Sequence, residues 1–157
     1  MSDPVQYYCL GHCTSKIKNF EDLVSIQSYG FRGEALHSLC TVSAVEITSK
    51  RAEDKIAKSI KFNTKCEKIK ETSIASTNGT IIKAMNIFEN MPVRRNYFKN
   101  TKKQKEDLKK IENILWSFGF IFPKIRISLH HNKQQNLVKT SCDSIFKASQ
   151  QCFGIGM

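Results

Sequence analysis

The 157-residue sequence contains three prolines and a single tryptophan, and no long uninterrupted apolar run. A bilayer-spanning helix needs roughly 20 consecutive apolar residues, and no signal-like segment opens the chain. The sequence therefore predicts neither a membrane partner nor a secretory route. The glycosylation sequon Asn78-Gly79-Thr80 carries little weight for the same reason.

Paired cysteine motifs are also missing, although the chain has six cysteines, at positions 9, 13, 40, 66, 142 and 152. None has Cys-x-x-Cys spacing, so reduced thiols in the cytosol or nucleus are expected. Two groups resemble partial zinc sites: Cys9, His12 and Cys13 form one, and His37 with Cys40 forms the other. Neither group has a second half at zinc-finger spacing. The favoured interpretation is buried or idle thiols.

Acidic residues are scarce relative to basic ones, with 14 Asp and Glu against 25 Lys and Arg, which gives a net charge of +11. Such an excess favours a polyanionic partner, with nucleic acid first. The alternative is a generally basic soluble protein. Clustering favours the first interpretation, since eight cations fall in one short stretch: Arg94, Arg95, Lys99, Lys102, Lys103, Lys105, Lys109 and Lys110.

The pattern of apolar residues predicts a mixture of helices and antiparallel strands. In the first part we expect helices at 19–26 and 34–39 and strands at 42–49, 56–63, 67–74 and 79–88. The most apolar strand, 79–88, is expected at the centre of an antiparallel meander. Helices on one face of that sheet would make an α+β layer.

The second part begins with the clearest helix, predicted at 101–118. Thr101 with Gln104 fits a capping box, Gly119 lies where a C-terminal glycine is expected, and the lysines lie opposite the apolar face. That face carries Leu108, Ile111, Leu115 and Phe118. Pro123 marks a boundary, after which strands at 125–129 and 136–139 flank a turn at Asn132-Lys133. A helix is expected at 144–152.

The segment Tyr29-Gly30-Phe31-Arg32-Gly33-Glu34-Ala35-Leu36 is the most informative feature. Glycine lets a backbone approach a ligand closely, and the first turn of a following helix offers N–H groups that suit phosphate. As a string it closely resembles the third ATP-site motif, or lid, of the MutL family, the mismatch-repair members of the GHKL (Bergerat-fold) ATPases.

Three further elements resemble the same family and keep its order. Thr14-Ser15-Lys16-Ile17 resembles the element upstream of the lid, with Cys13 where the family more usually has alanine. Asn78-Gly79-Thr80 resembles a later strand opening, and Pro92-Val93-Arg94-Arg95 with Tyr97-Phe98 resembles a basic segment. The resemblance extends from about Val5 to the C-terminus and is nearest to the eukaryotic post-meiotic-segregation (PMS) branch.

The resemblance implies an α+β fold with two parts. Residues 1–120 would be the C-terminal part of a Bergerat two-layer ATPase sandwich. Residues 121–157 would begin a transducer domain that is similar to ribosomal S5 domain 2. It also implies ATP and Mg²⁺ as cofactors. The residues that it places on ATP are Thr14, Ser15, Lys16, Gly30, Phe31, Arg32, Gly33, Glu34, Ala35, Leu36, Gly79 and Thr80.

Two hallmarks of the GHKL ATPases do not occur in these 157 residues. No Glu stands four residues before an Asn, and no Asp-x-Gly-x-Gly is present. In the family, the first motif supplies the catalytic Glu and the Mg²⁺-holding Asn, and the second supplies the Asp that binds adenine. We therefore expect an incomplete chain that begins just after the adenine pocket, ends within the transducer domain and does not hydrolyse ATP by itself.

The family's DNA-contacting position matches Lys99, and the sequence predicts DNA binding through Arg94, Arg95, Lys99, Lys102 and Lys103. Alternatives stay open: a solvated lysine face, or Arg94 fixing the loop after the sheet. Packing is favoured over base stacking for Tyr97 and Phe98. The implied function is DNA mismatch repair in the nucleus, as an ATP-dependent clamp with a second MutL-family subunit and MutS-type proteins. The competing hypotheses are a non-enzymatic DNA- or partner-binding module and a chain without a stable fold.

Overall fold

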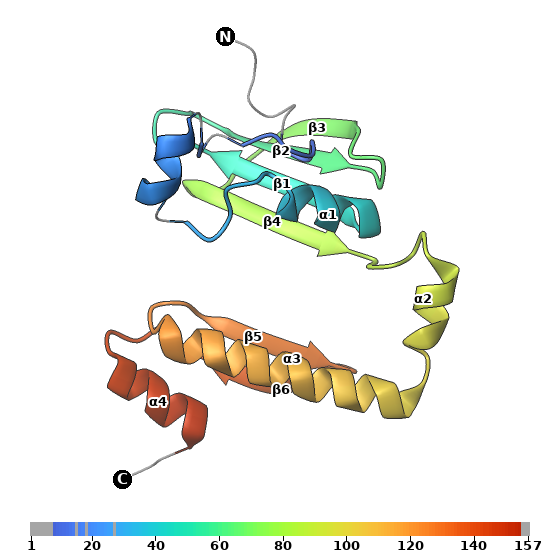
Figure 1. The fold of residues 1–157 in the computed structure, drawn as a ribbon, viewed down its shortest axis with the longest axis vertical. Helices are drawn as coiled ribbons and strands as arrows, with labels where there is room; N and C mark the ends of the chain where they lie inside the picture. The colour runs from blue at the N-terminus through green and yellow to red at the C-terminus, as the bar shows by residue number, and fades with distance from the viewer. Residues whose placement is uncertain (1–7, 15, 18, 27, 155–157) are drawn as a thin grey trace. The chain divides into compact units, whose positions relative to one another are not determined.

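The computed structural model describes residues 8–14, 16–17, 19–26 and 28–154. Contacts divide the chain into two compact units, Met1–Arg95 and Asn96–Met157. No helix in the described part of the chain is both long enough and apolar enough to cross a membrane. The α+β class predicted from the sequence is confirmed: each unit combines a small sheet with helices (Figure 1).

Unit 1 consists of a short 3₁₀ helix, an α-helix and a four-stranded antiparallel sheet. The elements are η2 (Phe20–Ser25), α1 (Ala35–Val42), β1 (Ala44–Lys50), β2 (Ala57–Phe62), β3 (Lys68–Ile74) and β4 (Gly79–Met85). All four strands fall where the sequence predicts them. Helix α1 lies along one face of the sheet, and η2 lies at its end (Figure 1).

The strand order is β3-β2-β1-β4, so the predicted meander is right for three strands and wrong for the fourth. Strand β4 returns to pair with β1, with Ile47 opposite Ile82, and it lies at an edge. The prediction of a central position for β4 is therefore wrong. Its apolar residues need covering, but apolar content does not determine strand order, and Ile82 is 50% exposed.

The core of unit 1 lies between α1 and the two central strands. Val45 pairs with Phe62 and Ile47 with Ile60, which places all four side chains on one face of the sheet. Three thiols complete this core: the buried cluster is Cys9, Cys40, Val45, Ile47, Ile60, Phe62 and Cys66, with Tyr8, Leu36 and Leu39 packed against it. The centre of the sheet is thus fixed by β1 and β2.

Unit 2 contains α3 (Thr101–Ile121), a hairpin of β5 (Ile127–His131) and β6 (Gln134–Lys139), and α4 (Ile145–Phe153). Asn132 and Lys133 both have positive φ, of 50° and 65°. This conformation is typical of a two-residue hairpin turn, as predicted. Helix α2 (Pro92–Tyr97) was not predicted. It begins with proline at its first position, where the missing N–H costs no hydrogen bond.

Helix α3 corrects two details of the sequence analysis. Its N-cap is Asn100, not Thr101, because the Asn100 side chain accepts hydrogen bonds from the backbone N–H groups of Lys102 and Lys103, at 3.1 and 3.2 Å. Gly119 is a buried residue inside the helix, which continues to Ile121. A Cβ on Gly119 would lie 3.4 Å from Cγ of Lys139, so this glycine allows close packing of α3 on the hairpin.

The position of α3 also bears on the organisation of the chain. The helix packs against α4 and β5 and so belongs to the second compact unit, whose first residue is Asn96. The sequence-based boundary at 120 assigned this helix to the first part. The assignment of the two parts to an ATPase and a transducer domain stays a prediction.

Candidate functional site

A pocket of about 400 Å³ lies in unit 1 at the start of α1. Its volume is within the range of small-molecule sites in proteins. The lining residues are Tyr8, Cys13, Thr14, Lys16, Tyr29, Gly30, Phe31, Arg32, Gly33, Glu34, Ala35 and Leu36. Two motifs that are separate in the sequence, the Thr14–Lys16 element and the Gly30–Leu36 loop, therefore face the same space.

The two motifs are held together by backbone approach at Gly33. Its φ is +68°, which side-chain-bearing residues adopt at a cost. A Cβ at Gly33 would lie 2.1 Å from the carbonyl oxygen of Cys13 and 2.8 Å from its nitrogen. Only glycine fits this position, so the loop packs directly on the backbone of Cys13.

Lys16 makes the second link between the motifs. Its Nζ donates a hydrogen bond to the carbonyl oxygen of Gly30 at 2.8 Å, and the Ser28 hydroxyl donates to the same oxygen at 3.1 Å. The Lys16 backbone N–H donates to the Thr14 hydroxyl at 3.2 Å. The ammonium of Lys16 is thereby positioned in the pocket wall without a carboxylate partner among the described residues.

Cationic side chains outnumber carboxylates among the described residues that line the pocket. Lys16 and Arg32 line it, and Glu34, the one carboxylate among the described lining residues, is 3.7 Å from His12. Ala35 and Leu36 precede the first hydrogen bond of α1, from Ser38 N–H to Glu34 at 2.8 Å. Helix geometry leaves such early N–H groups without an intrahelical acceptor. The pocket is therefore suited to an anion.

The core beneath α1 contains thiols that are unreactive near neutral pH because they are buried and protonated. The thiols of Cys9, Cys40 and Cys66 are buried there, and burial raises the pKa of Cys40 and of Cys66 to about 11. His37 Nδ1 lies 2.9 Å from the Cys9 carbonyl oxygen and 3.3 Å from Cys66 Sγ. In the part of the chain that the structure describes, no group of three His, Cys, Asp or Glu is arranged to hold a metal ion. Buried thiols were the favoured interpretation, and these three are buried.

Three predicted nucleotide residues are not among those described at the pocket. Ser15 lies outside the described residues. Gly79 and Thr80 open β4 and are not among the described residues that line the pocket. The Thr80 hydroxyl is 3.3 Å from that of Ser49, as expected for facing residues of β1 and β4. Tyr8 lines the pocket although no pattern in the sequence marked it.

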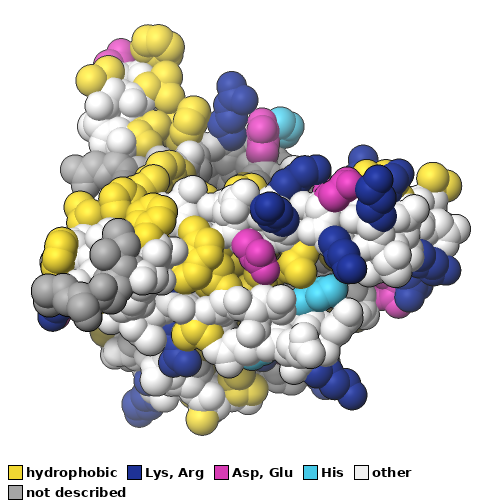
Figure 2. Space-filling view, turned by 90° about the horizontal axis from the view of Figure 1, so that it is seen from below, with side chains coloured by type: hydrophobic (Ala, Val, Ile, Leu, Met, Phe, Trp, Pro, Cys, Tyr) yellow, Lys and Arg dark blue, Asp and Glu magenta, His cyan; other side chains and the backbone are white. Residues whose placement is uncertain are grey.

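The predicted basic residues fall into both compact units and are described separately. In unit 1, the Arg94 guanidinium lies 5.4 Å from the centre of the Phe88 ring, and Arg95 is exposed. In unit 2, Lys99 and Lys102 are exposed, and Lys103 Nζ lies 3.9 Å from the centre of the Tyr97 ring. Figure 2 shows several Lys and Arg side chains close together on the right of the view.

Relatives with this sequence pattern are DNA mismatch repair proteins. The chain is 38% identical over 120 residues to human "PMS1 protein homolog 1" and 34% identical over 135 residues to human "Mismatch repair endonuclease PMS2". It is 33% identical over 130 residues to "DNA mismatch repair protein MutL" of Rippkaea orientalis. These alignments cover 76%, 83% and 83% of this chain. The chain belongs to the MutL family.

This MutL-family chain spans 13%, 15% and 23% of the lengths of those three relatives. A comparison with protein-family models finds no match. Among solved structures, it is similar to "Crystal Structure of N terminal domain of a DNA repair protein", with 28% identity and a TM-score of 0.70 over 98% of this chain and 46% of the other.

A second solved structure supports the fold of the MutL-family chain. It is the Aquifex aeolicus MutL ATPase domain complexed with ADP, which is 20% identical with a TM-score of 0.64 and is matched over 87% of this chain and 52% of the other. At that identity the likeness concerns the fold. The predicted α+β fold is thereby confirmed, and it matches that of solved MutL ATPase domains.

Proposed function

We propose that the pocket of this MutL-family chain receives the triphosphate end of ATP. The observation that carries the proposal is the convergence of the Thr14–Lys16 element and the Gly30–Leu36 loop on one cationic pocket at the start of a helix. Family membership supports it, since a MutL ATPase domain has been solved with ADP. Triphosphate is the part of the nucleotide that these groups suit.

Each group has a defined task in this proposal. The Lys16 ammonium exchanges its hydrogen bond with the Gly30 carbonyl oxygen for one with a phosphate oxygen. The new acceptor is negatively charged, so the hydrogen bond is stronger. The N–H groups of Ala35 and Leu36 donate to a second phosphate. Arg32 adds a further positive charge from the loop. The Thr14 hydroxyl remains within reach as a donor.

The pocket does not fit Mg²⁺ equally well. Magnesium is held by carboxylate and amide oxygens with near-octahedral geometry. Glu34 is the one carboxylate among the described lining residues, and His12 is its neighbour at 3.7 Å. Lys16, Arg32 and Thr14 are also unsuited to act as a general base near neutral pH. We therefore propose that these 157 residues alone do not turn over ATP.

Calorimetry with two probes tests the nucleotide proposal. Inorganic tripolyphosphate and a non-hydrolysable ATP analogue are titrated into the chain and into Lys16→Ala and Arg32→Ala. Because the adenine motif is absent from the sequence, we expect weak binding, with affinities for the two probes within about threefold, and a loss of about tenfold in each variant. Lys65→Ala, an exposed lysine of the same unit outside the pocket, is the charge-matched control.

Two outcomes would contradict this assignment. One is equal binding by Lys16→Ala, Lys65→Ala and the unchanged chain, which would remove the pocket from consideration. The other is steady ATP turnover that disappears in Arg32→Ala, which would show that a general base lies within these residues after all.

A second candidate function is DNA binding at the beginning of α3. No acidic residue lies in the first turn of this 21-residue helix, while Lys102 and Lys103 do. Cations at a helix N-terminus oppose the helix dipole, and a bound phosphate would relieve that opposition. We propose that Lys99, Lys102 and Lys103 contact the DNA backbone. For unit 1 we propose separately that Arg94 and Arg95 contact phosphates.

The wider assignment follows from the family. We propose that the protein acts in nuclear DNA mismatch repair as an ATP-dependent clamp, of the PMS branch, with a second MutL-family subunit and MutS-type mismatch recognition proteins as partners. The names of the relatives support DNA mismatch repair and MutL-type partners. Co-purification of a MutL-family subunit with the tagged chain from nuclear extract, and not with an unrelated tagged protein, tests the partner assignment.

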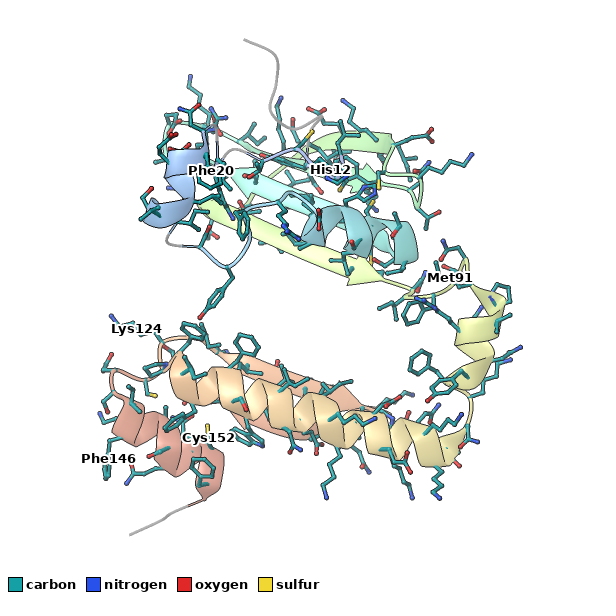
Figure 3. All side chains as sticks on the ribbon, in the orientation of Figure 1. His12, Phe20, Met91, Lys124, Phe146 and Cys152 are labelled. Atoms are coloured by element: carbon teal, nitrogen blue, oxygen red, sulfur yellow. The ribbon has the colours of Figure 1, made fainter. Side chains whose placement is uncertain are left out.

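The DNA assignment is tested by a salt titration. Replacing Lys99, Lys102 and Lys103 with Glu should remove up to three phosphate contacts and reduce the slope of log affinity against log salt by about 2–3. The control replaces Lys124, Arg126 and Lys147 with Glu, which gives the same change in net charge. Lys124 follows the far end of α3 (Figure 3), about 30 Å along the helix. Equal slopes in both variants would mean that only net charge matters.

A further inference from the structure

Tyr97 is a partly exposed aromatic residue that lies next to Lys103, at the start of α3. Tyr97 is the last residue of α2, and its side chain is 48% exposed. Phe98 is 38% exposed. The sequence favoured packing for these two residues, but a half-exposed ring also offers surface to a ligand.

The backbone around Tyr97 is fixed by contacts with the start of α3. The Asn100 N–H donates to the Tyr97 carbonyl oxygen at 3.4 Å, and the Gln104 side chain donates to the Phe98 carbonyl oxygen. The Phe98 ring is perpendicular to that of Tyr97, with an interplanar angle of 84° and centroids 5.4 Å apart. The Tyr97 ring therefore has Phe98 as an aromatic neighbour, and the Tyr97 backbone is joined to the N-cap of α3.

One lysine lies against the Tyr97 ring, and two more are its near neighbours in the sequence. Lys103 Nζ lies 3.9 Å from the Tyr97 centroid, and Lys99 and Lys102 are exposed on either side of the helix cap Asn100. A ligand that matches both the exposed aromatic ring and the lysines carries planar apolar faces together with negative charges. Single-stranded nucleic acid has this chemistry, whereas in a duplex the faces of the bases are already stacked.

We propose that Tyr97 is a stacking platform for an unpaired DNA base, with Lys99, Lys102 and Lys103 on the flanking phosphates. This inference rests on the proposed DNA binding and adds to it a preference for unpaired strands. It would let a protein that binds the backbone without reading sequence distinguish open DNA from paired DNA.

Lys103 covers the Tyr97 ring in the free chain and can be replaced there by a base. In the free chain its ammonium covers the ring in a cation–π contact, which is weak at an exposed site. Base stacking on an aromatic ring is generally stronger. When a strand binds, the ammonium moves from the ring to a phosphate and the base takes its place. The Lys103 ammonium thus contacts the Tyr97 ring in the free protein and a phosphate in the complex.

Fluorescence anisotropy with three labelled DNAs of about 12 nucleotides tests the inference. They are an oligothymidine, an abasic strand of the same length and a duplex. We expect the chain to bind oligothymidine about five- to tenfold more tightly than the abasic strand. Tyr97→Leu should abolish that difference and leave binding to the abasic strand and the duplex unchanged, while Tyr97→Phe should keep it.

The matched control is Phe118→Leu in α3, which removes an aromatic ring of nearly equal exposure, 47%, from a part of the helix without lysines. It should change none of the three affinities. Equal binding of oligothymidine and the abasic strand by the unchanged chain would overturn the stacking inference, and this comparison needs no variant to fold. Loss of the preference in Phe118→Leu would also overturn it.

The same data separate this inference from the function on which it rests. If all three DNAs bind and weaken with salt, but Tyr97→Leu is unaffected, phosphate contact is supported and stacking is rejected. If a folded chain binds none of them, the DNA-binding proposal and the stacking inference both fail.

Discussion

The two candidate sites of this chain are built in contrasting ways. In unit 1 the cationic groups line a pocket that exists because two backbone segments touch at Gly33 and Cys13. In unit 2 the cations project from the open beginning of a helix, and one of them covers an aromatic ring. The first arrangement depends on geometry that a single methyl group destroys. The second depends on the sum of several replaceable charges, so its response to mutation should be graded.

Gly33→Ala is expected to have the largest combined effect, because both stability and triphosphate binding should be lost. Gly33→Ala would place a Cβ 2.1 Å from the Cys13 carbonyl oxygen at a positive φ, so we expect a loss of roughly 3 kcal/mol in unfolding free energy and no triphosphate binding. Urea unfolding and calorimetry measure both.

Gly154 provides the control for that substitution. It also has a positive φ, +62°, but a Cβ there would meet nothing within 4 Å. Gly154→Ala should therefore cost only about 1 kcal/mol, the conformational part of the effect. Equal losses for the two variants would show that the contact with Cys13 is unimportant.

In unit 2, replacing Lys139, the one buried lysine among its described residues, should also lower stability strongly. Lys139 is 0% exposed, and its Nζ donates to the carbonyl oxygens of Phe122, Pro123 and Ile125, where α3 ends. Lys139→Met would remove the buried Nζ donor from all three oxygens, although those of Phe122 and Pro123 would still accept from the N–H groups of Ile125 and Cys142. We expect a cost of about 2–4 kcal/mol. Urea unfolding measures the change. Lys124→Met, at an exposed position, should cost nearly nothing, and a similar loss there would contradict the role of the three carbonyls.

Alkaline pH should distinguish the interior of unit 1. Burial raises the pKa of Cys40 and Cys66 to about 11, so the folded state keeps protons that the unfolded state releases above its ordinary thiol pKa. This stabilisation is complete below pH 8.5 and is lost as pH rises toward 11. Between pH 9 and 10 we expect a loss on the order of 1 kcal/mol per thiol.

The control for this titration is a chain with Cys40→Ala and Cys66→Ala, which reports every other alkaline effect, including lysine deprotonation. Chemical unfolding at each pH measures the difference between the two proteins. A difference that does not change with pH would mean that the two thiols ionise alike in the folded and unfolded chains.

The smallest effect concerns the cap that places the lysines of α3. Asn100→Ala removes the acceptor for the Lys102 and Lys103 N–H groups and should cost about 1 kcal/mol. Thr101→Ala, at the cap position predicted from the sequence, should change the unfolding free energy by only a few tenths of a kcal/mol. Helix content by circular dichroism and thermal unfolding measure both variants. The reverse order of effects would restore Thr101 as the cap.

Local patterns located most elements of this fold, with α2 missed, but they did not determine how the elements are arranged. Alternation and turn residues located β1 to β4, because strand formation depends on residues that are neighbours in the sequence. The edge position of β4 depends on which strand pairs with β1, a contact between residues more than 30 positions apart, such as Ile47 and Ile82. No periodicity within a strand reports that choice.

The candidate site shows the same division. The segments containing Thr14 and Gly33 were predicted as one site from a family resemblance, and the structure brings both to one pocket. Their chemical roles stay predictions. Tyr8 was missed because its place in the wall arises from tertiary packing on the Cys9 core. Asn100 was missed because Thr101 and Gln104 offered a matching cap pattern one residue later.

The contact between Gly33 and Cys13 places unequal demands on its two residues over evolutionary time. A side chain at position 33 would strike the main chain of residue 13, whereas the atoms that it would strike are backbone atoms, which every residue possesses. This contact therefore restricts position 33 to glycine and places no restriction on the side chain at position 13. A cysteine where the family more usually has alanine is what such a one-sided constraint permits.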